Sequence, residues 1–79
     1  MNPRVVSVKP LDGYQLHLTF ANGEVKQFDM RPYLDIGVFN EVKQAAMFAT
    51  AKAALGTVTW DNGADLCPDT LYLEGRAIG

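Results

Sequence analysis

The side chains of this sequence that could do chemistry are few, and most lie near its C-terminal end. Asp61, Asn62, Asp65 and Asp69 form the densest group of side-chain oxygens. Hard cations prefer clustered oxygens, so one hypothesis is a cation or phosphate–metal site. The spacing does not match a calcium loop, which has glycine at its sixth position and glutamate at its twelfth. Asn and Asp also bond their own backbone in turns, and we favour this structural interpretation.

His17 is the only histidine and Cys67 the only cysteine. A histidine-rich metal site or a histidine-paired nucleophile would therefore need other residue types. His17 falls on the polar side of an alternating segment, where a solvated or hydrogen-bonded imidazole is expected. Cys67 is expected to be a buried structural residue, since cysteine is among the most buried residue types. We assign no catalytic residue, metal or cofactor, and expect no enzyme activity.

Three strands are expected to position these groups, at residues 4–9, 14–20 and 24–29, as an antiparallel meander. Apolar and polar residues alternate through 14–20, which is typical of a strand with one buried face. The Asn22-Gly23 dipeptide that follows is a strong hairpin signal. A two-residue loop there would turn Phe28 to the His17 side of the sheet, so we expect a bulge near Lys26 to return Phe28 to the core.

The middle of the chain is expected to contain short helical turns, at 30–34 and 38–43, and it is ambiguous at 44–55. Helix propensity favours one long helix through the alanines, whereas a strand just before Gly56 would make a second hairpin with 57–60. Val58 to Gly63 repeats the pattern of Leu18 to Gly23: apolar, Thr, aromatic, one residue, Asn-Gly. Trp60 is therefore expected to end a strand at a second turn with its ring buried, and 67–72 to form a closing helical turn.

Composition indicates one small domain of 79 residues, nearly half of them hydrophobic. Seven scattered basic residues are outnumbered by nine acids, a balance that argues against nucleic-acid binding, although folding could gather some cations on one face. The unpaired cysteine fits a reducing cytoplasm. Neither a signal peptide nor a membrane span is expected, because no segment is long and apolar enough.

The sequence resembles the DUF2442 family, a small bacterial family of unknown function. The resemblance lies in VVSVKPLDGYQLHLTFANGEVKQFD, RPYLDIGVFNEVKQ and GTVTWDNGADLCPDTLY. It implies a single α+β domain over residues 3–72: an antiparallel β-meander, a short helical segment and a second hairpin. It also favours helix to about Phe48 and strand from about Thr50 in the ambiguous run. Residues 73–79 are expected to be a flexible tail.

The family supplies no catalytic residues, but its members suggest partners. Some relatives carry an added helix-turn-helix domain, which is not expected in this chain. Others are encoded beside a DUF4160 protein, in an arrangement similar to a toxin–antitoxin pair. The first hypothesis is therefore an antitoxin-like protein-interaction module that binds through a strand edge or an apolar patch. The candidate interaction or turn residues are Phe39, Trp60, Asp61, Asn62 and Asp65.

Two other functions are also compatible with the sequence. One is a nucleic-acid-associated regulator or accessory domain, although no nucleic acid is expected to bind this chain alone. The other is a small enzyme with an acidic site that uses Asp61, Asp65, Asp69 or His17. Homodimerisation by edge pairing is compatible with every hypothesis.

Overall fold

An antiparallel sheet, a separate hairpin and several short helices make up the chain in the computed structural model, which describes residues 2–78. In chain order the elements are β1 (Val5–Leu11), β2 (Gln15–Phe20), β3 (Val25–Asp29), η1 (Arg31–Tyr33), η2 (Gly37–Lys43), α1 (Ala45–Phe48), β4 (Lys52–Ala54), β5 (Thr57–Thr59), α2 (Pro68–Glu74) and β6 (Arg76–Ala77). The elements η1 and η2 are 3₁₀ helices. The predicted α+β class is confirmed.

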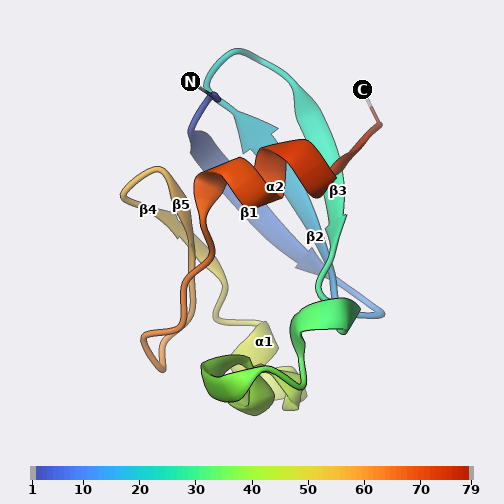
Figure 1. Cartoon of the computed structure of the whole chain (residues 1–79), viewed down its shortest axis with the longest axis vertical. Coiled ribbons are helices and arrows are strands. Elements are labelled where there is room, and N and C mark those ends of the chain that lie inside the picture. The colour runs from blue at the N-terminus through green and yellow to red at the C-terminus, as the bar shows by residue number, and fades with distance from the viewer. Residues whose placement is uncertain (1, 79) are drawn as a thin grey trace.

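The first three strands form the predicted meander, and the sheet order is β1-β2-β3-β6 (Figure 1). Residues of β2 alternate between half-buried and buried, with Leu16, Leu18 and Phe20 fully inside. This is the period of two that one buried sheet face requires. The inner face of β2 is thus the centre of the core.

The β2–β3 register differs from the expected one, because the loop has three residues. The N–H of Gly23 donates to the carbonyl of Phe20 at 2.9 Å, and the N–H of Phe20 donates to the carbonyl of Glu24 at 2.9 Å. Gly23 takes φ +89°, the left-handed position such a loop needs. Leu16 then pairs with Phe28, whose side chain is only 1% exposed. The expected bulge near Lys26 is therefore wrong.

A bulge does occur, but in the other hairpin. The β1–β2 register shifts between Val5 and Ser7. Val6, the extra residue, is 57% exposed, while Val5 is buried. The bulge lets β1 keep Val5 in the core and place Val6 outside.

The ambiguous run after Gln44 is a short helix followed by a strand. Helix α1 ends at Phe48, and β4 pairs with β5 through Lys52–Thr59, Ala53–Val58 and Ala54–Thr57. Pairing with β5 supplies backbone hydrogen bonds and buries Val58, and this tertiary gain overrides the helix propensity of the alanines. Two residues make the turn, Leu55 with φ +54° and Gly56 with φ +81°.

The second Asn-Gly corner has the same hydrogen-bond pattern as the first. The N–H of Gly63 donates to the carbonyl of Trp60 at 3.0 Å. The N–H of Trp60 donates to the carbonyl of Ala64 at 2.9 Å. The repeated sequence pattern thus encodes one turn geometry twice. Trp60 is 2% exposed, so its predicted burial is confirmed.

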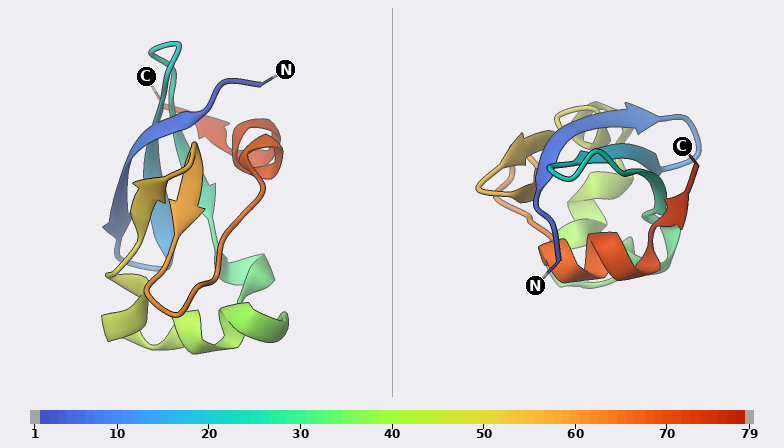
Figure 2. Two further views of the ribbon diagram at one scale, coloured as in Figure 1. Left: turned by 90° about the vertical axis from the view of Figure 1, so that its left-hand side faces the viewer. Right: turned by 90° about the horizontal axis from the view of Figure 1, so that it is seen from above.

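Helix α2 closes the fold over the inner face of the sheet, and the three short helices cover one end (Figure 2). Pro68 lies in its first turn and Leu71 is fully buried, as the sequence predicted. In place of the expected tail from residue 73, α2 continues to Glu74, and β6 pairs with β3 through Lys26–Ala77 and Gln27–Arg76. Residue 79 of that expected tail lies outside the described residues.

The core joins the sheet, the hairpin, the helical end and α2. Its largest fully buried side chains are Trp60, Phe20, Phe28, Leu16, Leu18, Met30, Leu71, Val42 and Val58. None of the helices within residues 2–78 has the length and apolar character needed to cross a membrane.

Candidate interaction surface

The acidic corner at 61–65 is built as a turn. The Oδ1 atom of Asn62 accepts a hydrogen bond from the backbone N–H of Ala64 at 3.0 Å, which satisfies a donor inside the turn. The Asp61 carboxylate pairs with Lys52 at 3.4 Å. Asp69 instead accepts a hydrogen bond from Asn2 at 3.1 Å. Across residues 2–78, no three His, Cys, Asp or Glu side chains come together in a group that could hold a metal ion.

Three of the five predicted candidates meet where this corner contacts η2. The rings of Phe39 and Trp60 pack edge to face with centroids 6.1 Å apart. The side-chain amide of Asn62 donates hydrogen bonds to the Val38 carbonyl at 3.3 Å and to Oε1 of Glu41 at 3.1 Å. These contacts fix the second hairpin corner against the start of η2.

Trp60 supports this junction from inside. Its indole N–H donates to the carbonyl of Phe48 at 3.2 Å, so its polar atom is satisfied within the core. At 2% exposure its ring cannot itself be an area of contact for a partner. Asp61 and Asp65 are exposed, whereas Phe39 is half-buried.

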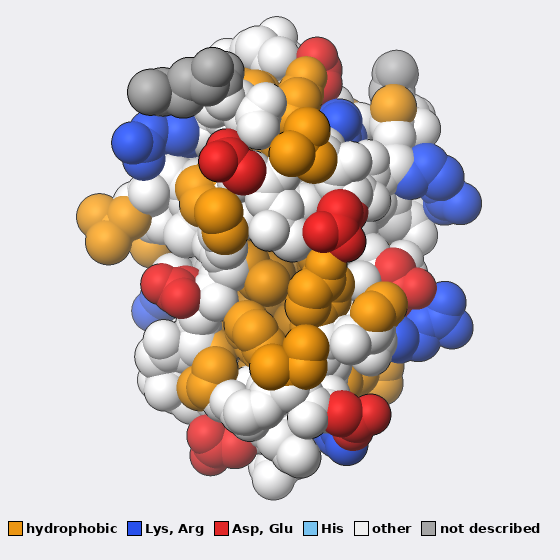
Figure 3. Space-filling view, in the orientation of Figure 1, with side chains coloured by type: hydrophobic (Ala, Val, Ile, Leu, Met, Phe, Trp, Pro, Cys, Tyr) orange, Lys and Arg blue, Asp and Glu red, His pale blue; other side chains and the backbone are white. Residues whose placement is uncertain are grey.

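The residues that face solvent at this junction are Ile36 and Val38, neither of which is among the candidates predicted from the sequence. Ile36 is 56% and Val38 49% exposed, and they flank Gly37. We refer to Ile36, Val38 and Phe39 as the 36–39 surface. Figure 3 shows apolar side chains gathered between α2 and η2, with acidic side chains at several points of their margin. The sequence feature that could have indicated this surface is the pair of apolar residues on either side of Gly37, which fit no regular helical stripe.

Charge is distributed unevenly along the sequence, between residues 35–74 and the remainder. Residues 35–74, which include this surface, carry six acids and two lysines, a net charge of −4. Both lysines, Lys43 and Lys52, pair with acids of the same part, Asp35 and Asp61. The 36–39 surface therefore belongs to the acidic stretch of the sequence.

The outer face of the sheet carries a different group of residues. Register places Lys9 opposite His17, His17 opposite Gln27, and Gln27 opposite Arg76. Directly paired residues of antiparallel strands project to the same side. Folding thus gathers two of the scattered cations and the lone histidine in one cross-strand row. It does not bring His17 together with the acidic corner.

A polar network lies at the edge of this sheet near η1. Arg31 donates two hydrogen bonds from Nε and one from Nη2 to the carboxylate of Asp29, the last at 2.8 Å. These hydrogen bonds lower the pKa of Asp29 to about 2. The hydrogen bond that the Tyr33 hydroxyl donates to Glu74 raises the pKa of Tyr33 to about 12. Both groups are occupied in joining η1 to its neighbours.

Cys67 does not occupy the buried position expected from its residue type. Its side chain is exposed and unpaired at the N-cap of α2. The helix needs the backbone of residue 67 in an extended conformation, with φ −68° and ψ 129°, at its first turn. This position points the thiol outward, while Leu66 and Leu71 on either side enter the core.

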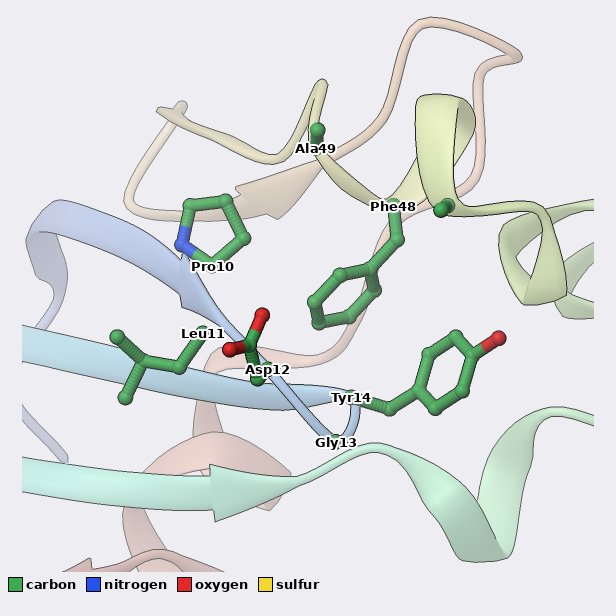
Figure 4. A pocket seen from close by; sticks show the side chains of 8 residues that line it. Pro10, Leu11, Asp12, Gly13, Tyr14, Phe48 and Ala49 are labelled. Carbon is green, nitrogen blue, oxygen red and sulfur yellow. The ribbon is translucent and has the colours of Figure 1, made fainter.

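A cleft of about 340 Å³ lies between the β1–β2 turn and α1. It is lined by Pro10, Leu11, Asp12, Gly13, Tyr14, Ala45, Phe48 and Ala49. Figure 4 shows side chains from the turn and from α1 meeting across this space. No local sequence pattern indicates this cleft, because its two walls come from segments about thirty residues apart.

The fold and these surfaces define a small α+β domain, with a β-meander and a second hairpin closed by short helices. The family model described as "Protein of unknown function (DUF2442)" matches residues 5–77, and the chain belongs to this family. Searches of curated proteins and of solved structures each gave no match.

Proposed function

We propose that this chain is a non-enzymatic protein-interaction module, the antitoxin-like partner of a small neighbouring protein. The observation that carries the proposal is the 36–39 surface, where two large aliphatic side chains about half exposed lie on a firmly held segment. A larger exposed apolar patch rimmed by polar residues is one mark of a protein-binding site, and Figure 3 shows apolar side chains gathered between α2 and η2. The proposal sets the chain in the cytoplasm, where an unpaired exposed cysteine stays reduced.

Pre-organisation supports binding at this surface. Asn62 holds the Val38 carbonyl, Phe39 packs on Trp60, and the buried Val42 anchors η2 in the core. A partner would therefore meet a surface whose backbone is already ordered. Binding then loses little conformational freedom, which favours affinity.

The strand edges are less suited to binding than this surface. Strand β1 carries Lys9, Pro10 and the bulge at Val5–Ser7, all of which oppose pairing with another strand. Strands β4 and β6 have only three and two residues. Edge pairing in a homodimer would therefore gain few hydrogen bonds, and we favour the apolar surface.

The net negative charge of residues 35–74 supports a partner with basic residues. Opposite charge at the rim of an interface raises the rate of association and helps to set its orientation. The family resemblance suggests an adjacent DUF4160 protein as this partner. We propose that such a protein contributes an apolar contact to the 36–39 surface and positive charge around it.

Co-expression with the adjacent gene product tests the proposal. The complex is expected to co-purify, and Ile36→Asp or Val38→Asp is expected to weaken it at least about tenfold, as for a central apolar contact. Leu55→Asp is the matched control, because it makes the same change at a side chain that is 91% exposed on the hairpin tip. Equal affinity of all variants, or no complex with the wild-type chain, would contradict the proposal. If light scattering gives the mass of a dimer for the isolated chain, and Ile36→Asp or Val38→Asp makes it monomeric, a second copy covers the 36–39 surface instead.

A nucleic-acid-associated regulator is the second candidate, favoured by the cross-strand row that contains Lys9, His17 and Arg76. Two cations neutralise few phosphates, whereas a protein whose DNA affinity falls steeply with salt makes about 6–10 phosphate contacts. We therefore rank it below the interaction module. A salt-sensitive mobility shift of DNA or RNA that is lost in a Lys9→Gln and Arg76→Gln double variant would reverse the order.

A further inference from the structure

We propose that the cleft between the β1–β2 turn and α1 binds an organic monocation, an alkylammonium group carried by a free amine or by a lysine side chain. This site is separate from the 36–39 surface and does not rest on the proposed function. Its volume of about 340 Å³ falls within the range of small-ligand pockets, about 300–1,000 Å³.

The walls are apolar except for one charged side chain. Pro10, Leu11, Tyr14, Ala45, Phe48 and Ala49 supply carbon surface, and Asp12 supplies the only charge in the lining. In Figure 4 the Asp12 carboxylate and the Phe48 ring both project into the space below Pro10, with the Tyr14 ring beside Phe48. An ammonium group with a short alkyl chain matches a carboxylate next to apolar walls.

The aromatic wall also favours a cation. The rings of Tyr14 and Phe48 meet edge to face with centroids 5.2 Å apart and planes at 74°. A cation within about 6 Å of a ring centroid is attracted by the negative face of the ring. Phe48 is only 6% exposed, so the half-buried Tyr14 ring offers most of the aromatic surface that a cation could reach, beside the full charge of the Asp12 carboxylate.

Contacts of Tyr14 fix the β1–β2 turn, one wall of the cleft, relative to α1, the other wall. Tyr14 has φ +60°, a left-handed conformation that is costly for a residue with a bulky side chain. Its hydroxyl donates a hydrogen bond to the carbonyl of Lys43, and its ring packs on Phe48. The Lys43 ammonium pairs with Asp35. Among the ion pairs of residues 2–78, none involves Asp12.

The test is an NMR titration of the full chain with n-butylammonium chloride, and with n-butanol as the neutral isostere. Backbone amide shifts are expected at residues 10–14 and 45–49 with the ammonium, at millimolar affinity, and weaker ones with the alcohol. Asp12→Asn is expected to reduce the ammonium affinity about fivefold, the size of one exposed charge pair, and to leave the alcohol unchanged. Asp65→Asn is the control for net charge, because Asp65 does not line the cleft.

A second variant changes the wall opposite Asp12, so that the test does not depend on a substitution in the β1–β2 turn. Ala49→Leu, at an exposed helix-end position, is expected to fill the cleft and abolish the shifts without loss of fold. Titration with the peptide acetyl-Gly-Lys-Gly-amide, and with its norleucine analogue, identifies the source of the cation. Tighter binding of the peptide assigns the site to a protein lysine, and tighter binding of the free amine assigns it to a small molecule. Equal binding of ammonium and alcohol, or no shifts at these residues, would overturn the proposal.

Discussion

The side-chain amide of Asn62 donates a hydrogen bond to the carbonyl oxygen of Val38, 3.3 Å away. This contact joins the second hairpin corner to η2, two segments more than twenty residues apart in the chain. It fixes the backbone of Val38, whose side chain is exposed, next to Phe39, whose ring packs on the buried Trp60. The same residue also closes its own turn through Oδ1, so one side chain determines both the local and the tertiary geometry.

Replacing Asn62 separates these two roles when it is compared with Asn22. Asn22 closes the first corner in the same way, with its Oδ1 accepting the N–H of Glu24 at 3.0 Å, and makes no bond to η2. We expect Asn22→Ala to lower the free energy of unfolding by about 1 kcal/mol and Asn62→Ala by about 2 kcal/mol, since more hydrogen bonds are lost. Urea unfolding measures both. Equal losses would show that the bonds to Val38 and Glu41 add no stability.

Leu55 is expected to be a position where substitution stabilises the protein. It takes φ +54° in the two-residue β4–β5 turn and is 91% exposed, so its side chain gains little burial for a left-handed backbone. Asparagine tolerates this conformation far better. Leu55→Asn should raise the free energy of unfolding by about 0.5–1 kcal/mol, as measured by urea unfolding.

Two further variants control for the exposed apolar surface and for the turn. Leu55→Ala removes the large side chain but not the strain, and should change stability little. Gly56→Ala should destabilise the protein, because φ +81° is strained for a residue with a Cβ, and that Cβ would also lie 2.8 Å from Cδ of Arg4. A gain from the alanine variant equal to that from asparagine would contradict the strain argument.

The ion pair of Asp29 with Arg31 predicts acid sensitivity in a defined window. The folded pKa of Asp29, about 2, lies below the unfolded value of about 3.9. The pair therefore stabilises the fold above about pH 4, and this contribution is lost as the pH falls toward 2. It should amount to less than about 1 kcal/mol, because the Asp29 side chain is 38% exposed.

Unfolding by urea at pH values across this window measures the effect. Asp29→Asn should lose less stability between about pH 4 and pH 2 than the wild-type chain does. Asp65→Asn, which removes a carboxylate outside the pair, should retain the full acid sensitivity. Parallel curves for the wild type and Asp29→Asn would refute this assignment.

Cys67 is expected to be replaceable with a gain in stability. It occupies the N-cap of α2 with no side-chain hydrogen bond to the helix. A serine hydroxyl there can accept a bond from a free N–H of the first turn, so Cys67→Ser should stabilise the protein by about 1 kcal/mol. Cys67→Ala, which cannot cap, should give no gain in the same thermal unfolding experiment. The wild-type thiol should react with a maleimide without denaturant, and resistance to labelling would contradict its exposure.

Much of the fold follows from local features of the sequence. Alternation through 14–20 identified β2 and its buried face, and Pro68 followed by Leu71 identified the closing helix. The repeated pattern before Gly23 and Gly63 predicted two corners, which prove to have the same hydrogen bonds. These features depend on the conformational preferences of a few adjacent residues, and such preferences can be recognised without knowing the rest of the chain.

Other features were decided only by contacts between distant segments. The length of the loop at Asn22-Gly23 set the register that buries Phe28, and no local rule distinguishes two loop residues from three there. Pairing with β3 gave residues 76–77 a strand structure in place of a tail. The candidate site divides in the same way, since Phe39, Trp60 and Asn62 were recognised singly, but Ile36, Val38 and the cleft were not.

The sequence alone thus determined where the chain turns and which side of its main strand is apolar, because turn chemistry and side-chain alternation act over a few residues. The tertiary structure decided the register, the choice of helix or strand after Phe48, and the exposure of Cys67. It also decided which surfaces remain open to a partner. These outcomes depend on hydrogen bonds and packing between segments far apart in the chain, whose free energies exceed the weak local preferences.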